Sequence, residues 1–119
     1  MTRLLLALLG ALALLVPLTA CTTPEPVSVD SATVVLDVRT PDEYAAGHLE
    51  GAKLLDLNSG EFEAALPSLD KAATYVVYCR SGNRAGQAVA LMEKAGIGAA
   101  TNAGSLEQAA KATGLAVVE

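Results

Sequence analysis

The sequence predicts an α/β domain in which a small parallel sheet is flanked by short helices. Short apolar, β-branched runs alternate along the chain with segments that carry helix-capping residues or helical periodicity. The 119 residues allow one domain, and a hydrophobic content of 52% is enough to form a core rather than a disordered chain. The net charge of −5 and the absence of a basic stripe argue against a nucleic-acid partner.

Residues 1–20 have the pattern of an export signal. Arg3 is their only charged residue, and the thirteen residues 4–16 contain no polar side chain. A membrane-spanning helix needs about 20 apolar residues, whereas this length is typical of a secretory signal peptide. We therefore expect residues 1–20 to be removed on export.

The residues around Cys21 resemble the lipobox of bacterial lipoproteins, Leu18-Thr19-Ala20-Cys21. The resemblance implies cleavage before Cys21 and fatty acylation of that residue, palmitate included, which would anchor the protein to a membrane on its periplasmic or extracellular side. Residues 21–27 contain two prolines and are expected to form an extended tether, followed by a domain over residues 28–119. The alternative is an ordinary signal peptide followed by a chance cysteine.

Two strands and two helices are expected in the first half of the domain. Val34–Val38 is apolar and β-branched, as in a buried strand. Thr40, a following proline and two acidic residues mark the start of a short helix that ends at Gly47. Residues 52–57 have strand character, and residues 59–66 should form a helix that Pro67 ends.

The second half begins with the strongest strand signal of the chain, Thr74–Tyr78. Residues 79–83 should form a tight loop, and residues 84–95 a helix with an alanine-rich apolar face. Residues 99–102 are expected to form a short strand and residues 105–112 a last helix, with a minor strand in the tail.

The loop after Thr74–Tyr78 is the candidate site. Cys79 follows a buried strand, and in parallel sheets ligands bind at the carboxyl ends of strands. The helix that follows presents unpaired N–H groups, and Gly82 and Asn83 tolerate the dihedral angles that turn a loop into a cup of donors. With Arg80 and Arg84 beside it, we expect the pKa of the Cys79 thiol to lie below its ordinary value of about 8.5.

The chain resembles the rhodanese (thiosulfate sulfurtransferase) domain over about residues 27–113. Three stretches match that family's motifs in order and spacing: Asp37-Val38-Arg39-Thr40-Pro41-Asp42-Glu43-Tyr44, Gly47-His48-Leu49-Glu50-Gly51-Ala52, where Leu49 replaces the usual isoleucine, and Tyr78-Cys79-Arg80-Ser81-Gly82-Asn83-Arg84-Ala85. A fourth stretch, Asn102-Ala103-Gly104, resembles the terminal motif but departs from it, because Ser105 replaces a second glycine. The resemblance implies a three-layer fold and is greatest to small, exported, single-domain rhodaneses of the phage-shock type.

The resemblance also implies a two-step sulfur relay. Cys79 would attack the outer sulfur of thiosulfate or of a persulfide donor, and the resulting persulfide would pass its sulfur to cyanide or a thiol. The loop residues would cradle the persulfide: Arg80, Ser81, Gly82, Asn83 and Arg84. Arg80 is expected to attract the anion, and Arg84 either locks the loop and favours the thiolate or is purely structural.

Other residues of the motifs are expected to be structural. The resemblance assigns this role to Asp37, Arg39 and His48, and Glu43 is interpreted as a first-turn acid. No cofactor is expected, and a single histidine with one remaining thiol argues against zinc. For Cys79, a disulfide with Cys21 and an inert buried thiol remain alternatives, and oligomeric state leaves no signal.

Loop length and cysteine count separate the competing functions. Four residues lie between Cys79 and Arg84, whereas related cell-cycle phosphatases and arsenate reductases have five, in a wider loop. We therefore expect sulfur transfer to small sulfur-containing anions and thiol acceptors rather than phosphate chemistry. The alternatives are a non-catalytic persulfide carrier or sulfur-sensing module, and a thiol-redox protein, which would need a second cysteine.

Overall fold

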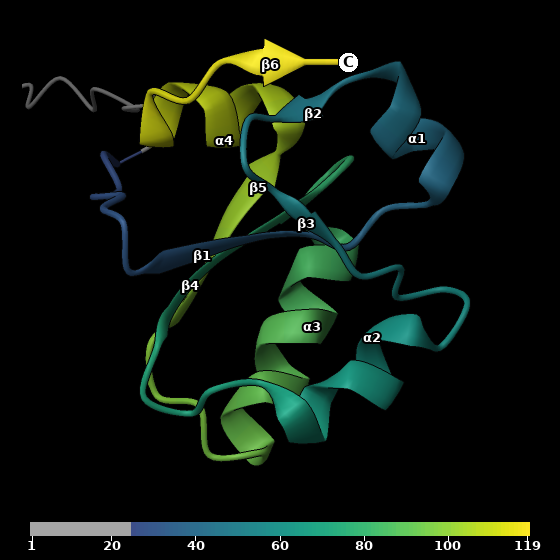
Figure 1. Cartoon of the computed structure of the whole chain (residues 1–119), viewed down its shortest axis with the longest axis vertical. Helices are drawn as coiled ribbons and strands as arrows, with labels where there is room; N and C mark the ends of the chain where they lie inside the picture. Colours follow the sequence, from purple (N-terminus) through teal and green to yellow (C-terminus); the bar gives the residue numbers. More distant parts are fainter. Residues whose placement is uncertain (1–24) are drawn as a thin grey trace, which may run out of the picture.

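The computed structural model describes residues 25–119, which form the predicted α/β fold around a four-stranded parallel sheet (Figure 1). The strands lie in the order β3-β1-β4-β5, and their bounds are β1 Thr33–Asp37, β3 Lys53–Leu54, β4 Thr74–Cys79 and β5 Ala100–Ser105. The expected export signal 1–20, Cys21 and residues 22–24 of the expected tether lie outside the described residues.

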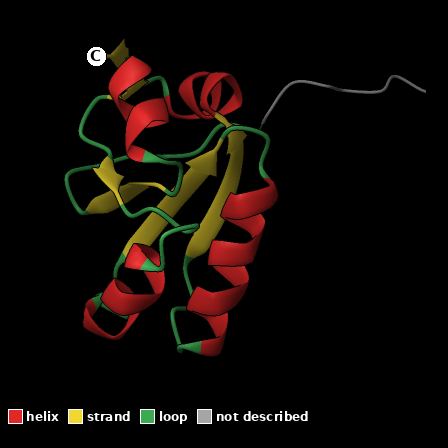
Figure 2. Cartoon of the chain, turned by 90° about the vertical axis from the view of Figure 1, so that its right-hand side faces the viewer, coloured by secondary structure: helices red, strands yellow, loops and turns green. Residues whose placement is uncertain are grey.

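Helices cover both faces of the sheet, which makes three layers. Figure 1 shows α2 (Glu61–Ala65) and α3 (Asn83–Lys94) on one side of the sheet and α4 (Leu106–Thr113) on the other. Figure 2 shows the long helix α3 running alongside the strands. Helix α1 (Pro41–Ala46) connects β1 with a small antiparallel pair, β2 (His48–Leu49) and β6 (Val117–Val118).

Each face of the sheet has its own hydrophobic core, because successive strand residues point to opposite faces. Toward α2 and α3, Leu36, Val77 and Cys79 pack with residues of the two helices, among them Phe62 and Met92. A second core lies toward α4. It is formed by the alternate strand residues Val35, Val76 and Tyr78 together with Leu49, Ala52 and Ala109. The alternation therefore decides that Cys79 and Tyr78 lie on opposite faces.

Strand order places the candidate loop at a switch point of the sheet. The chain leaves β1 toward β3 at one edge, and it leaves β4 toward β5 at the other edge. Because β1 and β4 are paired in parallel, with Asp37 opposite Tyr78, their carboxyl ends meet at one edge. Open α/β sheets bind ligands at such a point.

Capping residues begin the two helices that flank this edge. The Thr40 side chain accepts from the backbone N–H of Glu43, and the Glu43 side chain accepts from the N–H of Thr40, which completes the capping box of α1. Ser105 and Gln108 form the same arrangement at α4. Ser105, which replaces a family glycine, is thus the N-cap of the last helix.

Several element boundaries differ from the sequence expectations. Cys79 is the last residue of β4 rather than a loop residue, because it pairs with Ser105 of a β5 that runs three residues beyond its expected end. The strand expected over residues 52–57 is reduced to β3. Pro67 lies in a 3₁₀ turn, Leu66–Ser68, near whose start its missing N–H is tolerated. Strand β2, which pairs with the expected tail strand β6, was not indicated by the sequence.

One further contact holds the start of the described chain against α4. The N–H of Val27, the last residue of the expected tether, donates to the carbonyl of Ala112 at 2.8 Å. Among residues 25–119, no helix combines the length and apolar character needed to cross a membrane.

A buried ion pair follows β1 directly. Asp37 and Arg39 are 0% and 6% exposed, and Arg39 Nη2 lies 2.7 Å from Asp37 Oδ2 and 2.6 Å from the carbonyl oxygen of Gly47. The guanidinium also lies 5.5 Å from the ring centroid of Tyr78. Through the carbonyl of Gly47, this pair therefore connects the end of β1 with the end of α1, next to Tyr78 of β4.

Replacing Asp37 with alanine should lower the free energy of unfolding by about 3–5 kcal/mol, because Arg39 would keep a buried charge without its partner. Urea denaturation at pH 7 measures the difference. Asp42→Ala, at an exposed position on α1, serves as the control and should cost less than about 1 kcal/mol. Equal losses in the two variants would contradict a structural role for the pair.

Candidate active site

The sulfur of Cys79 lies at the carboxyl end of the central strand β4, where it meets the following loop. The residue is 0% exposed and carries a free thiol. Its side chain belongs to the core on the α3 face, which is what an inert cysteine would also show. Its sulfur nevertheless accepts a hydrogen bond from the backbone N–H of Gly82, at 2.9 Å between nitrogen and sulfur. A polar donor is therefore directed at the sulfur from the loop.

The loop reaches this arrangement through a left-handed glycine. Gly82 has φ 95° and ψ −12°, a conformation that favours glycine, and it is the N-cap of α3. Ser81 Oγ accepts from the N–H of Asn83 at 3.4 Å, and Asn83 Oδ1 accepts from Gln87 at 2.7 Å. The expected cup of backbone donors thus has one N–H on the sulfur, whereas Ser81 and Asn83 stabilise the turn.

Arg84 is held by Glu43, a residue that sequence reasoning interpreted only as a first-turn acid. The two guanidinium nitrogens Nη1 and Nη2 donate to the two carboxylate oxygens at 2.9 and 3.0 Å. The pair joins α1 to the start of α3 across 41 residues of sequence. This contact fits both expectations for Arg84, a residue that locks the loop and a purely structural ion pair. The position of Glu43 three residues after the Thr40 cap was the available sequence signal.

The ion pair changes the acidity of both partners. The hydrogen bond from Arg84 lowers the pKa of Glu43 from 4.5 to about 2. The same hydrogen bond raises the pKa of Arg84 above its ordinary value. Both groups are therefore charged throughout the neutral range, and the charge of Arg84 is largely matched by Glu43.

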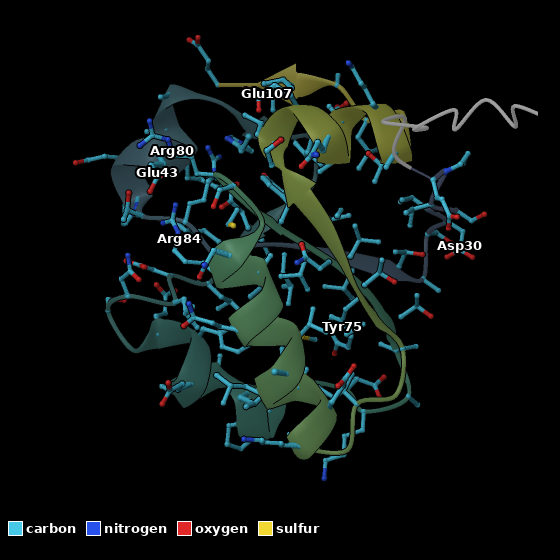
Figure 3. The ribbon with its side chains drawn as sticks, turned by 180° about the vertical axis from the view of Figure 1, so that it is seen from behind. Asp30, Glu43, Tyr75, Arg80, Arg84 and Glu107 are labelled. Carbon is cyan, nitrogen blue, oxygen red and sulfur yellow. The ribbon has the colours of Figure 1, made fainter. Side chains whose placement is uncertain are left out.

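Arg80 differs from Arg84 in its exposure and partners. Its side chain is exposed and has no ion-pair partner within the described part of the chain. Figure 3 shows Arg80, Glu43 and Arg84 at the same end of the molecule, whereas Tyr75 lies elsewhere along the sheet. Arg80 is thus the cation of this loop that is available to an anion from solvent.

The other motif residues lie beside the site. Asp37 and Arg39 form the buried pair next to Tyr78, whose hydroxyl accepts from the N–H of Leu49 at 3.0 Å. Burial raises the pKa of Tyr78. His48 stacks on Tyr44 with 3.7 Å between ring centroids, and its Nδ1 donates to the carbonyl of Tyr44. These contacts support the turn after α1 and do not involve Cys79.

A polar contact from β5 also reaches the loop. Asn102 Nδ2 donates to the carbonyl oxygen of Gly82 at 2.9 Å, and its Oδ1 accepts from the N–H of Gly104 at the same distance. The Asn-x-Gly motif was recognised in the sequence, but its contact with the Cys79 loop was not, because twenty residues separate the two. Within residues 25–119, no three His, Cys, Asp or Glu side chains gather as metal ligands would.

Comparisons with known proteins agree with this geometry. Residues 27–112 match the family described as Rhodanese-like domain. Thiosulfate sulfurtransferase PspE of Escherichia coli K12 is 35% identical over 75 residues, which cover 63% of this chain and 72% of that protein. The solved structure titled "rhodanese with anions from E. coli" aligns with a TM-score of 0.62 at 31% identity, over 74% of this chain and 99% of that one.

A much longer relative is similar over part of its length. The "Probable adenylyltransferase/sulfurtransferase MoeZ" of Mycobacterium tuberculosis H37Rv is 43% identical over 65 residues. That match covers 52% of this chain but only 16% of MoeZ. The similarity therefore concerns one segment of that protein.

The ion pair between Glu43 and Arg84 should make stability depend on pH in acid. Because folding lowers the pKa of Glu43, its contribution is fully present above about pH 4.5 and is lost as the pH falls toward about 2. Glu43→Gln should cost about 1–2 kcal/mol at pH 7, since the pair is bidentate but partly exposed.

Denaturation of the wild type and Glu43→Gln between pH 7 and pH 2 measures this effect, and the difference between them should shrink with acidity. Glu63→Gln, at an exposed position on α2, should behave as the wild type at each pH. A difference that stays constant over the whole range would contradict the assignment.

Proposed function

The chain belongs to the rhodanese-like family, and from this premise we propose that it transfers sulfane sulfur through a persulfide on Cys79. The donor is thiosulfate or a persulfide, and the acceptor is cyanide or a thiol. The observation that carries the proposal is the hydrogen bond from the Gly82 N–H to the Cys79 sulfur, at the end of the central strand. An inert core cysteine needs no such donor.

The proposed chemistry consists of two displacements at sulfur. In the first, the Cys79 thiolate forms a bond with the outer sulfur of thiosulfate, the sulfur–sulfur bond of the donor breaks, and sulfite leaves with the electron pair. In the second, the acceptor attacks the terminal sulfur of the persulfide, and the Cys79 thiolate is regenerated. With cyanide the product is thiocyanate. No oxidant or metal is needed, because in each step one bond to the transferred sulfur forms while another breaks and its electron pair leaves with the departing group.

In this proposal, one loop residue attracts the donor by its charge and another stabilises the sulfur by a hydrogen bond. The exposed guanidinium of Arg80 attracts the anionic donor, which approaches a domain that is acidic overall. The Gly82 N–H stabilises negative charge on the sulfur during attack and release. Arg84, paired with Glu43, keeps the start of α3 in place. Because Cys79 is fully buried, neighbouring loop atoms must move before the donor reaches its sulfur.

The size of the loop favours sulfur over phosphate as the transferred group. Four residues separate Cys79 from Arg84, and Arg84 is turned toward Glu43. Phosphate-transferring relatives use a loop that is one residue longer and forms a wider ring. The short loop therefore suits one persulfide sulfur rather than a phosphoryl group.

We further propose that the protein is exported and lipid-anchored. The support is the apolar stretch 4–16 and the lipobox-like residues that end at Cys21. Removal of the signal would leave Cys21 at the new amino terminus, where acyl chains would hold the domain on the periplasmic or extracellular side of a membrane.

Cys79→Ser should reduce the formation of thiocyanate from thiosulfate and cyanide at least a thousandfold, because oxygen cannot carry the transferred sulfur. After treatment with thiosulfate alone, mass spectrometry should find one added sulfur atom on the wild-type peptide that contains Cys79. The variant's circular dichroism should match the wild type, which separates loss of the nucleophile from loss of the fold.

The non-catalytic persulfide carrier is the alternative outcome of that experiment. Formation of the persulfide without thiocyanate production above the Cys79→Ser background would support the carrier and defeat the proposed turnover.

Cys21→Ala should abolish incorporation of radiolabelled palmitate when the full chain is expressed in a bacterium that processes lipoproteins. Cys79→Ser is the matched control, since it removes the other cysteine and should label as the wild type does. Equal labelling of Cys21→Ala and the wild type would defeat the lipid-anchor proposal.

A further inference from the structure

Asn102 connects the Cys79 loop with the turn that begins α4. Its amide uses both ends: Nδ2 donates to the carbonyl oxygen of Gly82, and Oδ1 accepts from the N–H of Gly104, each at 2.9 Å. These bonds join β5 to the N-cap of α3, an end that has no side-chain cap of its own. The asparagine therefore holds the backbone of the N-cap residue through its carbonyl and does not cap the free N–H groups of α3.

Three glycines surround this amide group. A Cβ atom on Gly82 would lie 3.3 Å from the Cα of Gly104, and one on Gly86 would lie 3.4 Å from Nδ2 of Asn102. Gly82 and Gly104 both have positive φ, 95° and 83°. The loop and the end of β5 thus approach closely, a Cβ atom on Gly82 would require Gly104 to shift, and Asn102 bonds to both segments.

Both backbone groups of Gly82 form hydrogen bonds that bear on the Cys79 sulfur. Its N–H donates to the Cys79 sulfur, and its carbonyl oxygen accepts from Asn102 and from the Gly86 N–H, both at 2.9 Å. The N–H and the carbonyl lie in the two peptide planes on either side of the Gly82 Cα, which are linked by its φ of 95° and ψ of −12°. A contact that holds the carbonyl plane therefore removes one of the movements by which the N–H could turn away from the sulfur.

We propose that Asn102 is a positioning residue that holds Gly82 in the conformation from which its N–H reaches the Cys79 sulfur. Asn102 acts through Gly82 and touches neither the sulfur nor the donor. Its side chain is exposed, so its removal leaves no cavity in either core. Its effect on the sulfur is thereby separable from its effect on the stability of the domain.

The experiment compares Asn102→Ala, Asn102→Asp and Thr101→Ala in the intact protein. Aspartate keeps an acceptor for the Gly104 N–H but has no donor for the Gly82 carbonyl. Thr101 is the exposed neighbour on β5 and provides the control. The readouts are the rate of alkylation of Cys79 by iodoacetamide between pH 5 and pH 10, kcat and KM for thiosulfate, and Tm.

Both Asn102 variants should alkylate about tenfold more slowly at pH 7, with a profile displaced to higher pH, because a misdirected N–H stabilises the thiolate less well. For the same reason kcat should fall about tenfold. KM for thiosulfate should change by less than about twofold, since Arg80 is untouched, and Tm should fall by a few degrees at most. Thr101→Ala should match the wild type in every readout.

Wild-type alkylation profiles in both Asn102 variants, with a loss in Tm alone, would overturn the proposal and leave Asn102 as a structural contact. If Asn102→Ala does not fold, Asn102→Asp decides at high ionic strength, which screens the charge that the aspartate adds, because it preserves the bond to Gly104. The kinetic readout rests on the proposed sulfur transfer, whereas alkylation requires only the thiol. A reactive wild-type thiol without thiocyanate formation would defeat the proposed function and still test Asn102.

Discussion

The parallel pairing of β1 with β4 is the constraint on which the rest of this domain depends. It places Asp37 opposite Tyr78 and brings the carboxyl ends of both strands to one edge of the sheet. After β1 the chain runs to one edge of the sheet, and after β4 it runs to the other edge. The two connections therefore diverge and leave room for a ligand between them. Cys79 stands there, one residue beyond the paired Tyr78, with its side chain on the α3 face and its sulfur near the loop that follows.

The loop around this sulfur is held from two directions by residues distant in sequence. From the α1 side, Glu43 binds the guanidinium of Arg84 while it completes the capping box of its own helix. From the β5 side, Asn102 binds the carbonyl of Gly82. Most of the polar groups near the cysteine therefore bind one another, and the exposed cation Arg80 and the Gly82 N–H are those that face an anion. A frame with few available polar groups suits the proposed transfer of a single sulfur atom, once loop atoms move to expose the buried sulfur.

The fold could be predicted from the sequence largely because its signals are local. The β-branched run before Asp37, the capping residues at Thr40 and the strand before Cys79 each act within a few residues, and the structure contains an element at each place. Strand β2 was missed because it has only two residues, and its pairing with the expected tail strand β6 joins distant segments and leaves no periodicity. The cysteine and its loop were found because a buried strand, turn residues and a helix start follow one another directly in sequence, whereas Glu43 and Asn102 received their roles only from contacts across 41 and 20 residues.

The close approach of Gly82 to Gly104 also limits how the loop can be redesigned. A residue inserted after Cys79, as a wider ring for larger oxyanions would require, would displace Gly82 from a neighbour whose Cα lies 3.3 Å from the Cβ position. Gly104 leads directly into the capped start of α4, so it has little freedom to follow. Conversion of this scaffold to phosphoryl chemistry would therefore mean rebuilding the β5–α4 junction together with the loop, rather than grafting the longer loop alone.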